Sequence, residues 1–300
     1  MSLSPVLLFT YNRPLHTQKT LSALLENKLC KESELFVFSD GCKDEVDAKD
    51  VKEVRKIIHA IDGFRKVHII ENNDNQGLAN NIIGGVTKVI EEYGKVIVME
   101  DDLVTSPYFL TFMNEALDMF ENENRIGHIH GYCYPLPELP DAFLIKWAGS
   151  WGWATWKRAW QEFNSDGKAL LNEIKSRKLS RTFDFNGKYP YTRMLRRQVK
   201  GQNNSWAIRW NASLFLKDML SVNAGRSLVK NIGFDGSGTH SGSQDIFATH
   251  LYTQKLSIGI SEIEECKDAR KAIERYYGKT NSFWAKVKRR VNRHFSLVYK

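Results

Sequence analysis

The feature that most constrains the fold is an apolar run, residues 96–99, that stops at three consecutive carboxylates, Glu100, Asp101 and Asp102. An apolar run without polar alternation predicts a strand buried on both faces, as in a parallel sheet covered by helices. Ligands of such sheets bind outside the carboxyl ends of the strands, where these side chains would project. Clustered oxygen donors suit magnesium or manganese shared with substrate phosphates. The alternative is a solvated junction between strand and loop.

Three more apolar runs precede this one, and segments with helical spacing separate them. The predicted strands are residues 6–10, 35–39, 67–71 and 96–99. The predicted helices are residues 15–26, 45–61 and 78–93. This alternation predicts an α/β fold with a mostly parallel, Rossmann-like sheet flanked by helices. No GxGxxG fingerprint follows the first strand, which argues against a dinucleotide-dependent dehydrogenase.

A helix is predicted at residues 106–121 and a strand at 126–129, and then the composition changes. Residues 147–160 hold five tryptophans in fourteen positions. Such aromatic density indicates either core or a ligand platform. Core is favoured for Trp156 and Trp160, which are one helical turn apart. A ligand-contacting loop is favoured for residues 149–153, because glycines there allow a close approach.

Two later segments of the chain are predicted to cover the site. Residues 166–202 are polar and basic without apolar periodicity, so they are predicted to form a mobile excursion over the sheet that could cover an acceptor. Residues 231–242 form a glycine-rich loop that is expected to close over a ligand. Within it His240 is either structural or a contact to metal or phosphate.

The net charge of +8 is concentrated at the C-terminus, because residues 267–300 hold eleven Lys/Arg and two acidic residues. A nucleic-acid-binding domain is disfavoured, since residues 1–266 are close to neutral. Apolar residues at nearly helical spacing in residues 283–298, with basic residues between them, predict a basic amphipathic helix. This helix could bind an anionic membrane surface or dock on its own domain.

Other features of the sequence indicate the cellular compartment in which the protein is expected. No apolar run reaches the roughly 20 residues that span a bilayer, and no signal peptide is visible. The cysteines are widely spaced without CxxC pairs, which favours a reducing cytoplasm. These observations predict a cytoplasmic chain, peripheral at the inner face of the cell membrane if the tail binds lipid. The cysteines are Cys30, Cys42, Cys133 and Cys266.

With these motifs the chain resembles nucleotide-sugar-dependent glycosyltransferases of the GT-A fold, in particular family 2. The likeness rests on residues 10–14, 39–41 and 75–80 and on the triplet at 100–102, which matches the acidic DxD motif of the family. The resemblance implies a nucleotide-sugar donor, with UDP-sugar favoured, and a cofactor of Mn²⁺ or Mg²⁺. Asp102 would be the direct metal ligand, with His240 as a second. Nucleotide contacts would come from Thr10, Asn12, Arg13, Asp40, Gln76, Gly77, Glu100 and Asp101.

Beyond residue 102, the order of features is similar to that of the Golgi N-acetylglucosaminyltransferase that starts complex N-glycan antennae. The implied acceptor-binding residues are Trp151, Gly152, Trp153 and Trp206. The related enzyme has paired aspartates before a tryptophan, where this chain has Asn203 and Asn204. An amide cannot deprotonate an acceptor hydroxyl. Asp235 or Asp245 would then be the catalytic base, unless the alignment has slipped, the stereochemistry differs or the reaction is lost.

The resemblance implies transfer of a sugar to a glycan or lipid-linked glycan, as in bacterial surface polysaccharide synthesis. The expected division is a GT-A domain at 1–265, with a nucleotide-binding half at 1–102 and an acceptor-binding half at 103–265, followed by a basic tail at 266–300. Two alternatives are a catalytically silent nucleotide-sugar-binding protein and a sugar-phosphate nucleotidyltransferase. The second would also place carboxylate-bound magnesium beside an α/β sheet.

Overall fold

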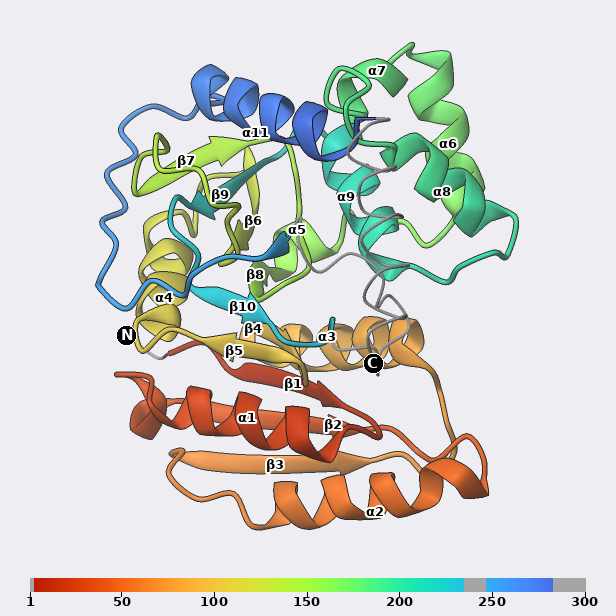
Figure 1. Ribbon diagram of the computed structural model, residues 1–300, viewed down its shortest axis with the longest axis vertical. Coiled ribbons are helices and arrows are strands. Elements are labelled where there is room, and N and C mark those ends of the chain that lie inside the picture. Colours follow the sequence, from red (N-terminus) through yellow and green to blue (C-terminus); the bar gives the residue numbers. More distant parts are fainter. Residues whose placement is uncertain (1–2, 235–246, 283–300) are drawn as a thin grey trace, which may run out of the picture.

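A computed structural model describes residues 3–234 and 247–282. The strands of its main sheet are β1 (Val6–Thr10), β2 (Glu34–Ser39), β3 (Lys66–Glu71), β4 (Lys95–Glu100), β6 (Ile126–His130), β7 (Ala142–Ile145), β8 (Trp153–Trp156) and β9 (Leu220–Ala224). They lie in the order β3-β2-β1-β4-β8-β6-β9-β7 (Figure 1). The first four are parallel, as are β6 and β9, while β8 and β7 run antiparallel to their neighbours.

Helices cover both faces of this sheet, so the predicted α/β GT-A architecture is confirmed. The helices are α1 (Pro14–Leu25), α2 (Glu45–His59), α3 (Leu78–Tyr93), α4 (Phe109–Met119), α5 (Lys157–Trp160), α6 (Gly167–Ser176), α7 (Ser180–Phe183), α8 (Tyr191–Val199), α9 (Trp206–Leu216) and α11 (Lys267–Thr280), with a 3₁₀ turn, η1 (Cys30–Glu32). A second, two-stranded sheet pairs β5 (Leu103–Thr105) with β10 (Val229–Asn231).

Strand β4 shows why the apolar run folds as it does. Ile97 and Met99 point into a core shared with α1, α2 and α4, whereas Val96 and Val98 point into a second core shared with α3 and α9. All four side chains are fully buried. Because both faces need apolar residues, the run has no polar alternation until the strand leaves the sheet.

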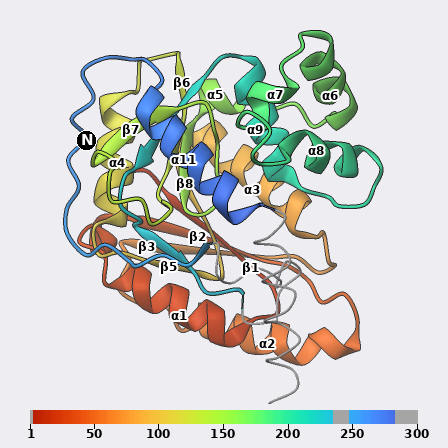
Figure 2. The ribbon, with the colours of Figure 1, turned by 45° about the horizontal axis from the view of Figure 1, so that its top comes forward.

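The sequence predicts a mobile excursion at residues 166–202, but the structure shows three helices packed against the domain. These residues form α6, α7 and α8, which bury residues such as Leu170, Ile174 and Leu195 against the rest of the domain. The buried residues are few and lie between many charges, so their helical spacing was missed. Figures 1 and 2 show this helical group at the opposite side of the molecule from α1 and α2.

The C-terminal region is described as far as Ser282. Helix α11 contacts β7 and buries Ala269, Ile273 and Tyr277 in the main core. The predicted amphipathic segment after it, residues 283–300, lies outside the described residues. Among the described helices, none combines the length and the apolar character that a membrane crossing requires.

Candidate active site

Most of the residues predicted to bind the nucleotide and the metal line a cavity of about 810 Å³. Strands β1, β2 and β4 are parallel neighbours whose carboxyl ends meet at one edge of the sheet, and β6 ends at the same edge. Four residues at or directly after these strand ends line the cavity: Thr10, Asp40, Glu100 and His130. The edge is where open α/β sheets bind ligands.

Asp40 organises the turn that follows β3. Its side chain is almost fully buried, and its Oδ1 accepts backbone N–H bonds from Gly41 at 3.0 Å and Gln76 at 2.9 Å. Its Oδ2 accepts the N–H of Gly77 at 2.9 Å. Gly77 has a φ of +74°, a conformation that favours glycine. Asp40 and Gly77 line the cavity, whereas the predicted contact Gln76 contributes its backbone to the turn and does not line it.

The loop after β1 is tied to the first turn of α2. Asn12 donates from Nδ2 to Oδ1 of Asp47 at 2.6 Å, and the hydroxyl of Tyr11 donates to Oδ2 of the same carboxylate. These bonds, first from Tyr11 and then from Asn12, lower the pKa of Asp47. Burial and the Asp47 hydrogen bond raise the pKa of Tyr11 above its usual value. The loop therefore holds Asn12 and Arg13 at the cavity wall in a fixed conformation.

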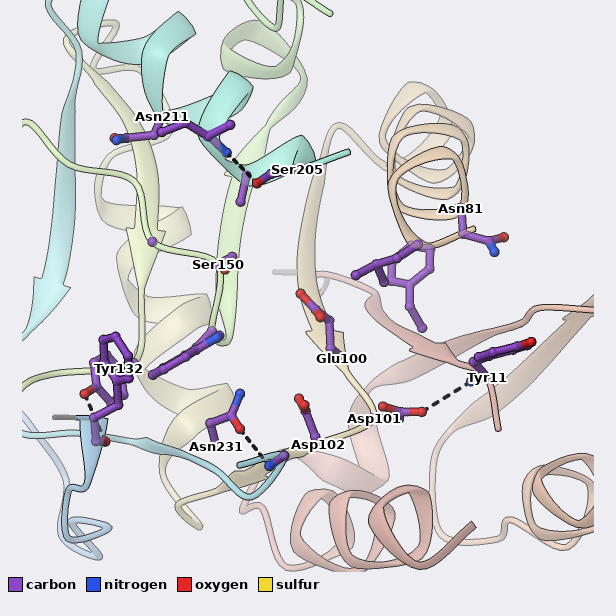
Figure 3. Close-up of a pocket in the computed structure, with 18 of the residues that line it drawn as sticks. Tyr11, Asn81, Glu100, Asp101, Asp102, Tyr132, Ser150, Ser205, Asn211 and Asn231 are labelled. Carbon is purple, nitrogen blue, oxygen red and sulfur yellow. Dashed lines mark hydrogen bonds between the residues drawn. The ribbon is translucent and has the colours of Figure 1, made fainter. Parts of the chain in front are cut away.

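The acidic triplet divides into two orientations. Figure 3 shows Glu100 and Asp102 directed toward the open cavity, while Asp101 turns toward Tyr11, whose backbone N–H it accepts at 3.2 Å. Burial and then the charge of Asp102 raise the pKa of Asp101 to about 7. Burial, followed by the charges of Asp102 and Asp101, also raises the pKa of Glu100 well above its usual value. Ionisation of all three carboxyls together is therefore disfavoured unless a positive charge lies beside them.

Asp102 is held from two sides. Arg13 forms an ion pair with it, with Nη1 at 2.9 Å from Oδ2. The backbone carbonyl of Asp102 accepts the N–H of Ile232 at 2.8 Å, which brings the chain after β10 across the carboxylate. A Cβ on Gly233 would lie 2.1 Å from Asp102 Oδ2. The absence of a side chain at Gly233 thus leaves the room that the Asp102 carboxylate occupies.

A divalent cation that is shared with a diphosphate needs only one or two carboxylates from the protein. The described residues contain no cluster of three or more His, Cys, Asp or Glu that would hold an ion alone. Two carboxylates directed into one cavity, Glu100 and Asp102, fit a shared ion, and their crowded negative charge favours one. The proposed second ligand, His240, lies outside the described residues.

The opposite wall of the cavity is aromatic and uncharged. In the described lining, the charged side chains are Arg13, Asp40 and the three members of the triplet, all at the ends of β1, β2 and β4. The aromatic side chains of the facing wall are Tyr132, Tyr134, Trp147, Trp151, Tyr189, Tyr191, Phe234 and Phe247. Figure 3 shows Ser150, Ser205 and Asn211 contributing polar groups on this side.

The aromatic wall is braced from the C-terminal helix. The hydroxyl of Tyr277 on α11 lies 2.8 Å from that of Tyr134 and 3.2 Å from that of Tyr191. Tyr277 itself is buried and does not line the cavity. No local pattern could have predicted this role, because the three tyrosines lie far apart in the chain.

Of the predicted acceptor residues, only Trp151 lines the cavity, where it packs edge-on against Tyr132 at 4.7 Å between ring centroids. Trp153 and Trp206 are instead in the core, stacked on each other with centroids 5.2 Å apart. Trp153 belongs to the central strand β8, which lies between β4 and β6, and its side chain is fully buried. Gly152 serves packing too, since a Cβ there would lie 2.6 Å from Val229. Trp156 and Trp160 are buried, as predicted.

His130 lines the cavity but was not predicted as a site residue. Its Nδ1 lies 3.3 Å from Oδ1 of Asn223, whose Nδ2 donates to the carbonyl of Ser221. Asn223 therefore presents an acceptor, so Nδ1 carries the proton and Nε2 is left as an acceptor with no partner in the described structure. Burial lowers the pKa of His130 to about 3. The position of His130 at the end of an apolar strand was the available signal.

Asn203 and Asn204 hold the start of α9. The Asn203 side chain accepts the N–H of Ser205 at 3.1 Å, and Arg209 donates to Asn204 at 3.3 Å. Ser205 caps the helix by accepting the N–H of Ile208. Neither asparagine lines the cavity, and the described lining on this side contains no carboxylate. The predicted bases, Asp235 and Asp245, lie outside the described residues.

Comparison with known structures finds TarS of S. aureus at 17% identity, covering 47% of this chain and 24% of that chain, with a TM-score of 0.32. A mannosyltransferase from Pyrobaculum calidifontis, in complex with GDP-Man and Mn²⁺, has 10% identity over 71% of this chain and 74% of that chain, with a TM-score of 0.39. Neither similarity is close enough to transfer properties of those proteins to this chain.

No curated protein matches the chain in sequence. The model of one family does match, that of glycosyl transferase family 2, over residues 6–199. The matched region runs from β1 to the end of α8 and includes the acidic triplet and most of the cavity. The chain therefore belongs to glycosyl transferase family 2.

Proposed function

We propose that the chain transfers a sugar from a nucleoside-diphosphate sugar to an uncharged sugar of a glycan or lipid-linked glycan. One observation carries this proposal: a single cavity joins an end rich in charged groups to a wall of aromatic rings without charge. The charged end suits a diphosphate, because its carboxylates can hold a cation that offsets the charge of the diphosphate. The aromatic wall suits a sugar, because the apolar faces of a sugar ring pack well on aromatic rings.

At the charged end, Asp102 would hold a Mn²⁺ or Mg²⁺ ion, with Glu100 directed into the same space. When bound, such an ion offsets the charge that develops on a leaving diphosphate. Arg13 supplies a further positive charge next to Asp102. Thr10, Asn12 and the turn held by Asp40 would contact the nucleotide.

At the aromatic end, the acceptor hydroxyl would attack the anomeric carbon while a carboxylate takes its proton. We assign that base to Asp235 or Asp245. Phe234 lines the cavity, so Asp235 directly follows a residue of the cavity wall. A lipid-linked acceptor in surface polysaccharide synthesis, used at the inner face of the cell membrane, would also suit the basic C-terminal region.

Nucleotide binding is tested by thermal unfolding of the full-length protein with UDP, GDP or ADP, each with and without MnCl₂. We expect one diphosphate to raise the melting temperature only with manganese. At 100 times its Kd, a ligand that binds only the folded state adds about 2.7 kcal/mol to the free energy of unfolding. If none of the diphosphates stabilises the protein with manganese, the proposed donor class is wrong.

The alternatives differ in their products. A nucleotidyltransferase would release pyrophosphate when given a sugar phosphate and a nucleoside triphosphate. A catalytically silent binding protein, which the lack of a carboxylate on the acceptor side of the described lining favours, would bind a nucleotide-sugar tightly with manganese but show no hydrolysis or transfer. Release of a free nucleoside diphosphate together with a glycosylated acceptor would support the transferase.

The acceptor wall is tested by Trp151→Ala. We expect the KM for the acceptor to rise about tenfold, because a stacked aromatic contact contributes roughly 1 kcal/mol beyond its buried area. The manganese-dependent thermal shift by nucleotide should stay as in the wild type, since Trp151 lies on the wall opposite the acidic triplet. An unchanged acceptor KM would remove Trp151 from the acceptor site.

A further inference from the structure

The positive charge of the chain is not confined to its C-terminus. Residues 166–202, which form α6, α7 and α8, hold ten Lys/Arg and three acidic residues. All ten basic side chains are exposed. Residues 1–266 are close to neutral only because the remainder of that region is acidic. The helical group is therefore a second basic region of the molecule, one that belongs to the folded domain.

Within this group, the charges of α8 lie on one face. Tyr191 and Leu195 are buried, and Tyr191 and Met194 line the cavity. Four basic residues, which we call the basic face, lie on the opposite side because a helix repeats every 3.6 residues. The basic face consists of Arg193, Arg196, Arg197 and Lys200, all exposed.

Within the described structure, none of the four side chains forms an ion pair. Arg177 in the same helical group does have such a partner, Glu173. Four like charges within about two helical turns repel one another. A surface that carries many negative charges would relieve this repulsion at all four positions together.

The described end of the chain lies beside this helical group. Asn281 donates to the carbonyl of Lys188, and Gly278 lies next to the Lys188 side chain. The hydroxyl of Tyr277 contacts that of Tyr191 at the start of α8. The eighteen residues after Ser282 include six Lys/Arg and no acidic residue. The described chain therefore ends beside the helical group, and the residues that follow in the sequence are basic.

We propose that the basic face of α8 docks on an anionic membrane surface. The apolar side of α8 packs inside the protein, so the contact is adsorption through charge and not insertion into the lipid. Docking would hold the aromatic wall, which α8 helps to build, close to acceptors carried by lipid. The benefit of this docking for transfer rests on the proposed function, whereas the contact with the membrane itself requires no substrate.

The test uses full-length protein and co-sedimentation with vesicles made of equal parts phosphatidylcholine and phosphatidylglycerol. In the variant R193Q/R196Q/R197Q/K200Q, we expect partition onto these vesicles to fall at least tenfold. Wild-type binding should weaken as salt rises from about 0.05 M to about 0.5 M, because salt screens exposed charges. Wild-type binding to pure phosphatidylcholine should be negligible.

A matched control removes the same charge elsewhere, in K19Q/K49Q/K52Q/K66Q on α1, α2 and β3. These lysines are exposed, and the elements that carry them lie on the opposite side of the molecule from α8 (Figure 1). The control should bind vesicles as the wild type does, and unchanged melting temperatures will show that both variants fold. Three results overturn the proposal: wild-type vesicle binding by the α8 variant, an equal loss in the control, or a loss of heparin binding alone, which would indicate a soluble polyanion as the partner. None depends on transfer, so the docking can fail while the proposed function stands.

Discussion

Asp102→Asn is expected to lower kcat/KM for sugar transfer by about 10³-fold, which corresponds to about 4 kcal/mol of lost transition-state stabilisation. The amide keeps the shape of the side chain but loses the charge that would hold a divalent cation. Asp102 already faces the cavity with Arg13 as its partner. In the variant, Arg13 would lack that partner, and the cavity would lose one of the two carboxylates that are directed into it.

Asp268→Asn provides the control for this change, because Asp268 on α11 is exposed and does not line the cavity. Its side chain is 97% exposed. We expect wild-type kcat/KM for the control and loss of the manganese-dependent thermal shift only in Asp102→Asn. Full transfer activity in Asp102→Asn, with wild-type dependence on manganese, would show that the ion is held elsewhere or is not used.

The four strands and three helices of residues 1–100 could be predicted to within one or two residues, in large part because the strands β1, β2 and β4 are buried on both faces. Such strands read as uninterrupted apolar runs, and each stops at a polar residue, as β4 does at Glu100. The parallel order of these strands explains why most of the predicted nucleotide residues line one cavity. Parallel strands bring their carboxyl ends to one edge, whatever the distance between them in the chain.

The acceptor side could not be predicted in the same way, because its form depends on contacts between distant segments. Nothing in the local sequence separates Trp151, which lines the cavity, from Trp153, which is core. The difference arises because Trp153 enters the central strand β8. The three-residue strands β5 and β10 are too short to show a period, yet their pairing brings Gly233 to Asp102.

Gly233→Ala is expected to lower kcat/KM for transfer by roughly 10²-fold, the cost that a displacement of about 1 Å in a catalytic group can have. The new methyl group would meet Oδ2 of Asp102 at 2.1 Å and Nη1 of Arg13 at 3.0 Å. Both are ends of flexible side chains, so they can move without disturbing the backbone. We therefore expect the free energy of unfolding to change by no more than about 1 kcal/mol.

The matched control is Gly259→Ala, at an exposed loop glycine where an added Cβ would meet no atom within 4 Å. It should leave both stability and transfer unchanged. Gly233→Ala should also need more manganese for half-maximal activity, since the methyl group displaces the carboxylate proposed to hold the ion. A variant that loses activity only because it unfolds would show a matching fall in melting temperature. If Gly233→Ala is stable and keeps wild-type kcat/KM and manganese dependence, the position of the Asp102 carboxylate cannot be critical to the reaction.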